Sequence, residues 1–212
     1  GVPLGVRWYM RNSERDYEVS VEPLVGTVVV EPPVGAGPTP LTKGQSKSVP
    51  AGTAIYVDET SEAVITFFDH SFMRLFPGTS MRLQTLSAPR YGSGRAPTRI
   101  VLRMLSGRVR VGTALPFKQT PLDFAISTPY GDATLAADGS YALEVKQETV
   151  ELATYRGSST LSSDGELVMV AARERTSCRL GEAPQAPTAL AKNLVANGEF
   201  NEPLDDWRVF ND

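Results

Sequence analysis

Short stretches with alternating apolar and polar residues recur along the chain. The alternation has a period of two in residues 17–21, 124–126, 141–145 and 150–152. This period places one side of a β-strand on a core and the other side in water. More continuous apolar runs occupy residues 25–30, 63–68 and 167–172. Such runs are typical of strands that are covered on both faces.

Turn-forming residues separate these stretches, since the chain contains 18 Gly and 16 Pro. Gly adopts positive φ without strain, and Pro is excluded from helix interiors. The predicted hairpin turns are Pro77-Gly78, Ser106-Gly107, Asp138-Gly139 and Asp164-Gly165. No stretch predicts a substantial helix. Many short strands at this spacing predict an all-β fold, either an antiparallel β-sandwich or a rolled, jelly-roll-like sheet.

Three stretches rich in Pro, Gly and polar residues predict loops. They span residues 32–52, 87–97 and 181–187. The last of them, Gly-Glu-Ala-Pro-Gln-Ala-Pro, has the composition of an interdomain linker. A new strand-and-turn pattern begins after it, at Asn193.

The order of the motifs between about residues 25 and 175 resembles the FecR domain. In that family a strand ends in a turn and returns as alternating apolar residues up to Pro-x-Thr. The matching residues here are Phe68-Asp69-His70-Ser71, Met73, Leu75 and Pro77-Gly78-Thr79. The family's Leu-x-x-Gly-x-Val-x-Val matches residues 104–111, Phe-x-Ile-x-Thr-Pro-x-Gly matches 124–131, and the closing Gly-Thr-x-Phe matches 139–143. Two departures are His70, in place of a turn Gly, and Ser140-Tyr141 in the closing motif.

The resemblance implies a role outside the cytoplasm. Founding members of the FecR family are membrane-spanning regulators, which sense a loaded outer-membrane transporter and signal to a cytoplasmic sigma factor. Other members are surface modules attached to different domains. No sigma-binding segment is recognisable in this sequence, so the iron-uptake role is an implication of the family alone.

We therefore expect four regions along the chain. Residues 1–16 form an N-terminal or juxtamembrane tail, 17–180 the FecR-like β domain, 181–192 a linker, and 193–212 the truncated start of a second β domain. That last stretch resembles the opening of a galactose-binding-like, carbohydrate-binding module. At the other end, Gly1 in place of Met indicates a piece of a longer protein. Trp8 and Tyr9 beside Arg11 are typical of the end of a membrane helix, with a tail or an edge strand as the alternative.

The supply of reactive side chains is small. The net charge of −3 argues against nucleic-acid binding. Because the chain has only one His and one Cys, its composition also argues against a nucleophile–base pair and a zinc site. We predict no catalytic residue, metal or cofactor, and a buried structural role for Cys178. The remaining candidates for an acid pair or a calcium site are carboxylates, namely Asp58, Glu59 and Glu62, or Asp69 beside His70. Solvated turn residues are the alternative interpretation.

The charge distribution is uneven. No Asp or Glu occurs from His70 to Leu122, a stretch with nine Arg or Lys residues. If Ser106-Gly107 is a hairpin turn, Arg103 faces Arg110, and one solvent face carries Arg99, Arg103, Arg108 and Arg110. Ile100, Leu102, Met104, Val109 and Val111 then share the core face. These arginines predict an anion-binding strip for lipid headgroups, acidic glycans or an acidic partner protein. In the alternative, Glu144, Glu148 or Glu151 on a neighbouring strand neutralises them.

Together these features predict a non-catalytic extracytoplasmic module for binding or sensing. We expect an upstream membrane helix, outside this chain, to tether it at the periplasmic side or the cell surface. Its partner would be a protein or an envelope polymer. The alternative is a carbohydrate-recognition protein whose main sugar site lies in the truncated C-terminal domain, with Trp207 as a stacking platform. A glycoside hydrolase would need two carboxyl groups about 5–10 Å apart in a cleft, and we do not predict one.

Overall fold

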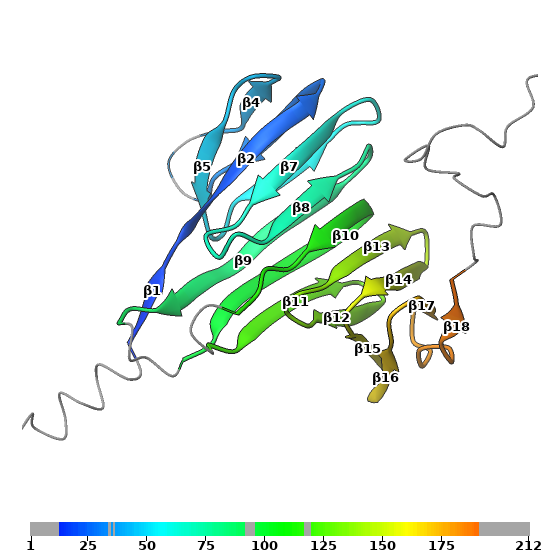
Figure 1. Cartoon of the computed structure of the whole chain (residues 1–212). Helices are drawn as coiled ribbons and strands as arrows, with labels where there is room; N and C mark the ends of the chain where they lie inside the picture. The colour runs from blue at the N-terminus through cyan, green and yellow to red at the C-terminus, as the bar shows by residue number, and fades with distance from the viewer. Residues whose placement is uncertain (1–12, 34, 36, 92–95, 117–119, 191–212) are drawn as a thin grey trace, which may run out of the picture.

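A computed structural model describes residues 13–33, 35, 37–91, 96–116 and 120–190, and every regular element in it is a β-strand (Figure 1). This confirms the all-β prediction. The part of the chain described here contains no helix with the length and hydropathy needed to cross a membrane. The aromatic residues expected beside a membrane and the expected second domain from Asn193 onward lie outside the described residues.

The strands form two sheets, which share one strand. Sheet A runs in order of pairing through β4 (Thr39–Thr42), β3 (Thr27–Glu31), β6 (Ala54–Val57), β9 (Ser80–Pro89), β10 (Thr98–Gly112), β11 (Leu122–Thr128), β12 (Gly131–Leu135), β15 (Ser159–Ser163) and β16 (Glu166–Val170). The short β1 (Glu14–Asp16) lies beside the end of β9. Sheet B runs through β5 (Lys47–Pro50), β2 (Glu18–Val25), β7 (Glu62–Thr66), β8 (Phe72–Leu75), β10, β13 (Ser140–Lys146), β14 (Thr149–Arg156), β17 (Glu174–Arg179) and β18 (Thr188–Ala189).

Neighbouring strands are antiparallel, except that β10 and β11 run parallel. Within the described residues, β4 and β16 pair on one side only at the ends of sheet A, as do β5 and β18 in sheet B. The strands therefore form a mixed, open arrangement and do not close into a barrel.

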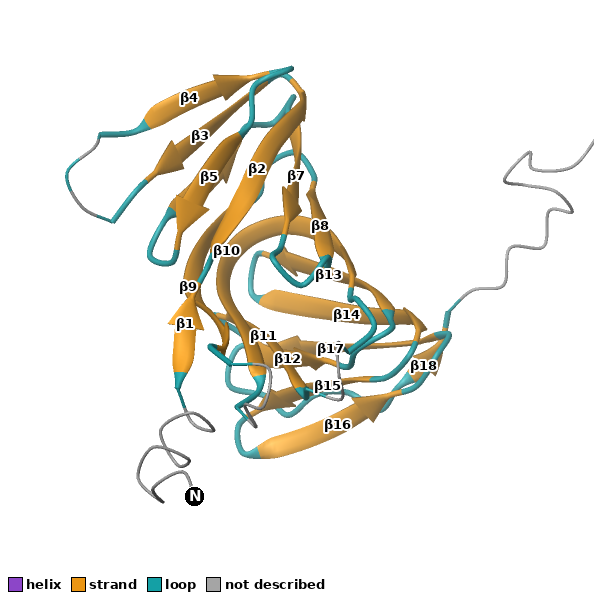
Figure 2. Ribbon diagram, turned by 60° about the vertical axis from the view of Figure 1, so that its left-hand side comes forward, coloured by secondary structure: helices purple, strands orange, loops and turns teal. Residues whose placement is uncertain are grey.

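The core lies between the two sheets, and the strands curve around it (Figure 2). Alternate residues of each strand point inward, as the period-two pattern predicts. On β10 the inward side chains are Ile100, Leu102, Met104, Val109 and Val111, each at most 2% exposed. Phe67 and Phe124 meet edge to face, with ring centroids 5.4 Å apart.

The predicted hairpin at Ser106-Gly107 is wrong. β10 continues through both residues and passes from sheet A into sheet B. Gly107 has φ +96°, so the strand bends there without reversing. A Cβ at Gly107 would overlap the Thr79 backbone, so the chain at Thr79 packs directly against this bend.

Two corners of the chain stack beside this bend, one between β8 and β9 and the other between β6 and β7. Thr79 Oγ1 donates to the Phe76 carbonyl (2.6 Å) and accepts the Arg108 N–H (3.2 Å). The Gly78 N–H donates to the Asp58 carbonyl of the neighbouring corner (3.0 Å). Hydrogen bonds from the Thr60 N–H, from nearby hydroxyls and from the Ser61 N–H lower the pKa of Asp58. These bonds let each segment turn from one sheet into the other.

Of the other three predicted hairpin turns, one is confirmed and two are wrong. Asp164-Gly165 joins β15 and β16 as a hairpin, as predicted. The sequence also predicts hairpin turns at Pro77-Gly78 and Asp138-Gly139, but both are corners at which the chain changes sheet. The local signal for a turn is the same in both cases, because Gly permits either geometry.

The predictions for apolar runs and for one loop also need correction. The strands within 25–30, 63–68 and 167–172 are buried on one face only, and Leu167 and Met169 on β16 are 62% and 67% exposed. The predicted loop at 32–52 contains β4 and β5. The predicted linker at 181–187 leads along β17 into β18, and its Gln185 N–H donates to the Ser177 carbonyl (2.9 Å).

Candidate functional site

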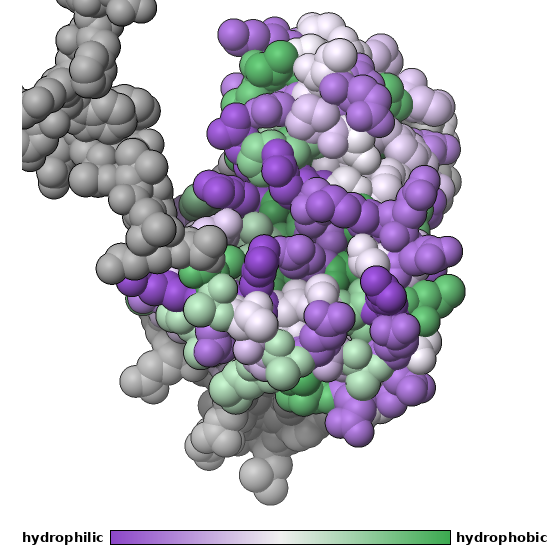
Figure 3. Space-filling view, turned by 90° about the vertical axis from the view of Figure 1, so that its right-hand side faces the viewer, coloured by the Kyte–Doolittle hydropathy of each residue, from purple (hydrophilic) through white to green (hydrophobic). Residues whose placement is uncertain are grey.

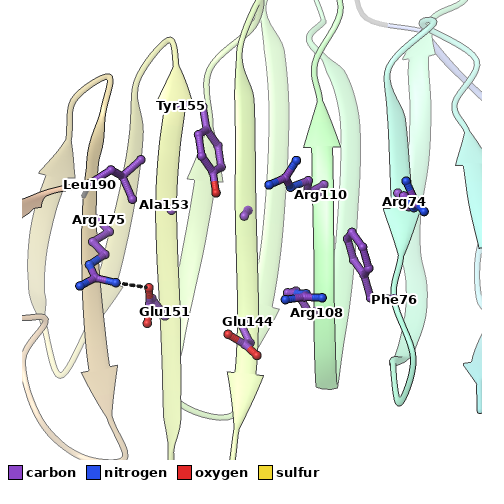
Figure 4. Close-up of a pocket in the computed structure, with 11 residues that line it drawn as sticks. Arg74, Phe76, Arg108, Arg110, Glu144, Glu151, Ala153, Tyr155, Arg175 and Leu190 are labelled. Carbon is purple, nitrogen blue, oxygen red and sulfur yellow. Dashed lines mark hydrogen bonds and ion pairs between the residues drawn. The ribbon is translucent and has the colours of Figure 1, made fainter. Parts of the chain in front are cut away.

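The outer face of sheet B carries a groove of about 470 Å³, which lies over β8, β10, β13, β14 and β17 (Figure 4). Strand register builds it in two rows. One row crosses the sheet as Arg74, Arg110, Ala142, Ala153 and Arg175. The next row contains Arg108, Glu144, Glu151 and Ser177, with Phe76 beside Arg108.

Two alanines form the floor of the groove. Ala142 and Ala153 are cross-strand neighbours, and larger side chains flank them on both sides. Arg110 and Arg175 stand at the ends of this alanine pair, three strand spacings apart, or about 14 Å between their backbones. The hollow therefore exists because the two central residues of the row lack long side chains.

Aromatic rings hold the arginines on the β10 side. The Arg108 guanidinium lies over the Phe76 ring, 4.4 Å from its centroid, and Arg74 lies 5.2 Å from the same ring. Arg110 lies 5.3 Å from the centroid of Tyr155. A contact of this kind restricts the motion of a flexible guanidinium. Its cation–π attraction contributes about 0.5–1 kcal/mol at exposed sites. The cations are thereby pre-positioned along one wall.

Carboxylates follow Arg108 in its row, on β13 and β14, but they are paired with other cations. Glu144 Oε2 lies 2.9 Å from Lys146 Nζ, and Glu151 Oε1 lies 3.4 Å from Arg175 Nη1. Glu148 is in the turn between β13 and β14, at φ +64°. Arg74 pairs with Glu62 on β7. Among the described residues, Arg108 and Arg110 take part in no ion pair, so none of these three glutamates pairs with them directly.

The structure divides the predicted arginine strip between two faces. Arg108 and Arg110 line the groove on sheet B, whereas Arg99 and Arg103 lie on sheet A. Arg103 does not face Arg110; its cross-strand neighbours are Arg82 and Ser127. Arg99 is neutralised, with Nη1 3.1 Å from Glu14 Oε1 and Nε 3.4 Å from Asp123 Oδ2. Binding by these four residues stays a prediction, and it now concerns two separate surfaces.

The other candidates from the sequence have structural roles. Asp58 Oδ1 accepts the Thr60 N–H (2.8 Å), Asp69 Oδ1 accepts the Ser71 N–H (2.9 Å), and both organise turns. His70 is in the second turn at φ +71°. Cys178 is buried as predicted, and its thiol lies 3.0 Å from the Glu182 carbonyl. The described residues contain no group of three or more His, Cys, Asp or Glu side chains arranged to hold a metal ion.

Several residues of the groove gave no separate signal in the sequence. Arg74 was one of many arginines, and Tyr155 and Arg175 lie outside the acid-free stretch. Ala142 and Ala153 become informative only because β13 and β14 place them side by side.

The surface toward the right of Figure 1 mixes hydrophilic residues with scattered hydrophobic ones (Figure 3).

No family model matches the chain, and no curated protein matches it. Two crystal structures do match, each described as a "putative anti-sigma factor from Parabacteroides distasonis", at 2.50 Å and 1.65 Å resolution. Their TM-scores are 0.49 and 0.50, with 15% sequence identity. The match covers 65% of this chain and 59% of theirs. The chain is thus similar in fold to part of a protein of that description.

Proposed function

We propose that this chain is the extracytoplasmic binding and sensing module of a membrane-tethered FecR-type signalling protein, and that it has no catalytic activity. Two observations support the class: the ordered FecR-like motifs, and a fold similar to that of a protein described as an anti-sigma factor. The tether, the extracytoplasmic location and the sigma-factor link belong to this proposal and rest on the family resemblance.

The ligand binds, in this proposal, on the outer face of sheet B. The observation that carries it is the pair Arg108 and Arg110, which stand in a groove, are held by aromatic rings and take part in no ion pair among the described residues. Like charges two residues apart on one strand repel each other, and an anionic ligand would relieve that repulsion. Guanidinium groups bind carboxylate and phosphate through paired hydrogen bonds.

The test is retention of the purified chain on immobilised polygalacturonate and on phosphatidylglycerol vesicles across a salt series. We expect retention at low salt that weakens as salt screens the contacts. The Arg108→Ala/Arg110→Ala variant should lose about tenfold or more in affinity, because each charge-assisted hydrogen bond contributes about 1.5–3 kcal/mol.

The matched control removes the same charge outside the groove and outside the predicted strip. Arg82 on β9 and Lys43 in the turn between β4 and β5 take part in no ion pair among the described residues. The Lys43→Ala/Arg82→Ala variant should keep wild-type retention. Equal losses in both variants would show a general charge effect, and no retention of the wild type on either surface would refute the assignment of the ligand to this face.

A further inference from the structure

The groove carries information about ligand chemistry beyond its positive charge. A site for a simple polyanion would be lined with cations throughout. Here Arg108 and Arg110 stand side by side on β10, and Glu144 and Glu151 follow Arg108 in its row, on β13 and β14. A ligand that fills the groove must therefore offer negative charge on one side and hydrogen-bond donors on the other.

The floor adds an apolar requirement. The methyl groups of Ala142 and Ala153 line the hollow. Tyr155 stands further along β14, with its hydroxyl end toward Ala153 (Figure 4). A ligand that rests on this floor needs a small apolar face. The groove volume of about 470 Å³ falls within the range of ligand sites, about 300–1,000 Å³.

The backbone of the floor excludes one class of ligand. In the groove, the N–H and C=O groups of β10, β13 and β14 are engaged in the sheet, because each of these strands has a partner on both sides. An extended peptide gains affinity mainly by adding a strand to an open edge, and the groove offers no such edge. Recognition here must come from side chains.

From this combination we infer that the groove binds an acidic sugar, one that carries a carboxylate beside unsubstituted hydroxyl groups. The inference rests on the proposed function. The carboxylate binds Arg108 and Arg110, hydroxyls donate to Glu144 and Glu151 and accept from Arg175, and the C–H face of the ring lies on Ala142 and Ala153. Sugar hydroxyls suit walls of both signs because each one donates and accepts.

Isothermal titration calorimetry of the whole chain with three probes tests this inference. The probes are trigalacturonate, its methyl ester and hexa-aspartate. Trigalacturonate should bind, and the ester should bind about tenfold or more weakly, because it lacks the charge-assisted contacts. Hexa-aspartate should bind more weakly than trigalacturonate, because Glu144 and Glu151 repel it.

Two variants separate sugar recognition from general attraction of anions. Ala153→Leu fills the hollow without a change of charge, so trigalacturonate binding should fall at least about tenfold. Its matched control, Ala125→Leu, adds the same side chain to the outer face of sheet A and should bind normally. Glu144→Gln should weaken trigalacturonate binding and strengthen hexa-aspartate binding, since it removes a charged acceptor and a repulsive charge at once.

The outcomes distinguish the two proposals. If hexa-aspartate and trigalacturonate bind equally and Ala153→Leu has no effect, the sugar inference is wrong while anion binding by the arginines stands. If no anionic probe binds, the proposed binding face fails as well. Thermal unfolding of each variant confirms that a loss of binding is not a loss of fold.

Discussion

Tyr141 shows how a single side chain fixes a connection in this fold. It is 1% exposed, and its hydroxyl lies 2.9 Å from the Ala136 carbonyl and 3.1 Å from the Ser158 carbonyl, to which it donates. A Cβ at Gly139 would overlap this hydroxyl, so the Gly-x-Tyr spacing is a packing requirement. The departure from the FecR motif at Ser140-Tyr141 thus has a clear structural role.

Tyr141 also makes stability depend on alkaline pH. Burial raises the pKa of Tyr141 above its ordinary value near 10. The stabilising contribution of the neutral hydroxyl is therefore fully present below the unfolded-state pKa, and it is lost as pH rises through the folded-state pKa.

We expect Tyr141→Phe to reduce the free energy of unfolding at pH 8 by about 0.5–1.5 kcal/mol, because one hydrogen bond is lost. Both carbonyls keep another donor, Thr113 Oγ1 for Ala136 and the Ala136 N–H for Ser158. The same variant should lose less stability than the wild type between pH 8 and pH 11. Urea unfolding at the two pH values measures both effects. A wild type and a variant with parallel pH profiles would contradict the assignment of the alkaline loss to Tyr141.

At the scale of the element, the sequence of β10 predicts its core residues correctly but its path wrongly. Its period-two alternation correctly predicted five core residues, because side-chain alternation is a local property of any strand. The same stretch wrongly predicts a hairpin, because Ser106-Gly107 is compatible with a reversal and with a bend. The choice depends on the packing of Thr79 against Gly107, which no local pattern encodes.

The bend predicts a strong cost for any side chain at Gly107. Gly107→Ala combines the strain of positive φ with overlap on the Thr79 backbone, and we expect a loss of about 3 kcal/mol or more. Gly165→Ala is the control, since Gly165 has φ +78° in an open hairpin and nothing lies within 4 Å of its Cβ position. It should lose only about 1–2 kcal/mol. Similar melting temperatures for the two variants would argue against the close packing at the bend.

The groove illustrates the same limit at the level of several elements. Arg108 and Arg110 were predicted from a charge pattern along one strand. Their aromatic and acidic neighbours come from β13, β14 and the residue after β8, and only the register between strands brings them together. The parallel pairing of β10 with β11 is likewise invisible in a sequence, because it is a property of chain path and not of residue type.

At the scale of the whole molecule, sheet B extends beyond the predicted domain end at residue 180, to β18 at Thr188–Ala189. The segment after β17, which has the composition of a linker, packs along β17: Thr176 Oγ1 donates to the Gln185 carbonyl (2.5 Å), and Pro184 is buried. It also covers Cys178, the single cysteine of the chain. A flexible connection would leave this thiol open to reagents.

This coverage predicts slow modification of Cys178 in the native protein. Replacement of residues 182–190 with a Gly-Ser repeat of equal length should raise the rate of reaction with a disulfide reagent at least about tenfold, because local opening is no longer required. The thiol of the urea-unfolded chain gives the upper limit. A wild-type rate already near that limit would show that the segment does not shield Cys178.

The sharing of β10 between both sheets has a consequence for biosynthesis. A ribosome releases β8 and β9 before β10, but the partners on its other side, β11 and β13, follow only later. Until then β10 is the outermost strand of each sheet, with unpaired backbone groups and an alternating apolar face. Exposed edges of this kind promote association between nascent chains. The nine cationic residues from His70 to Leu122, with no acidic residue among them, give these intermediates a shared positive charge that opposes such contacts.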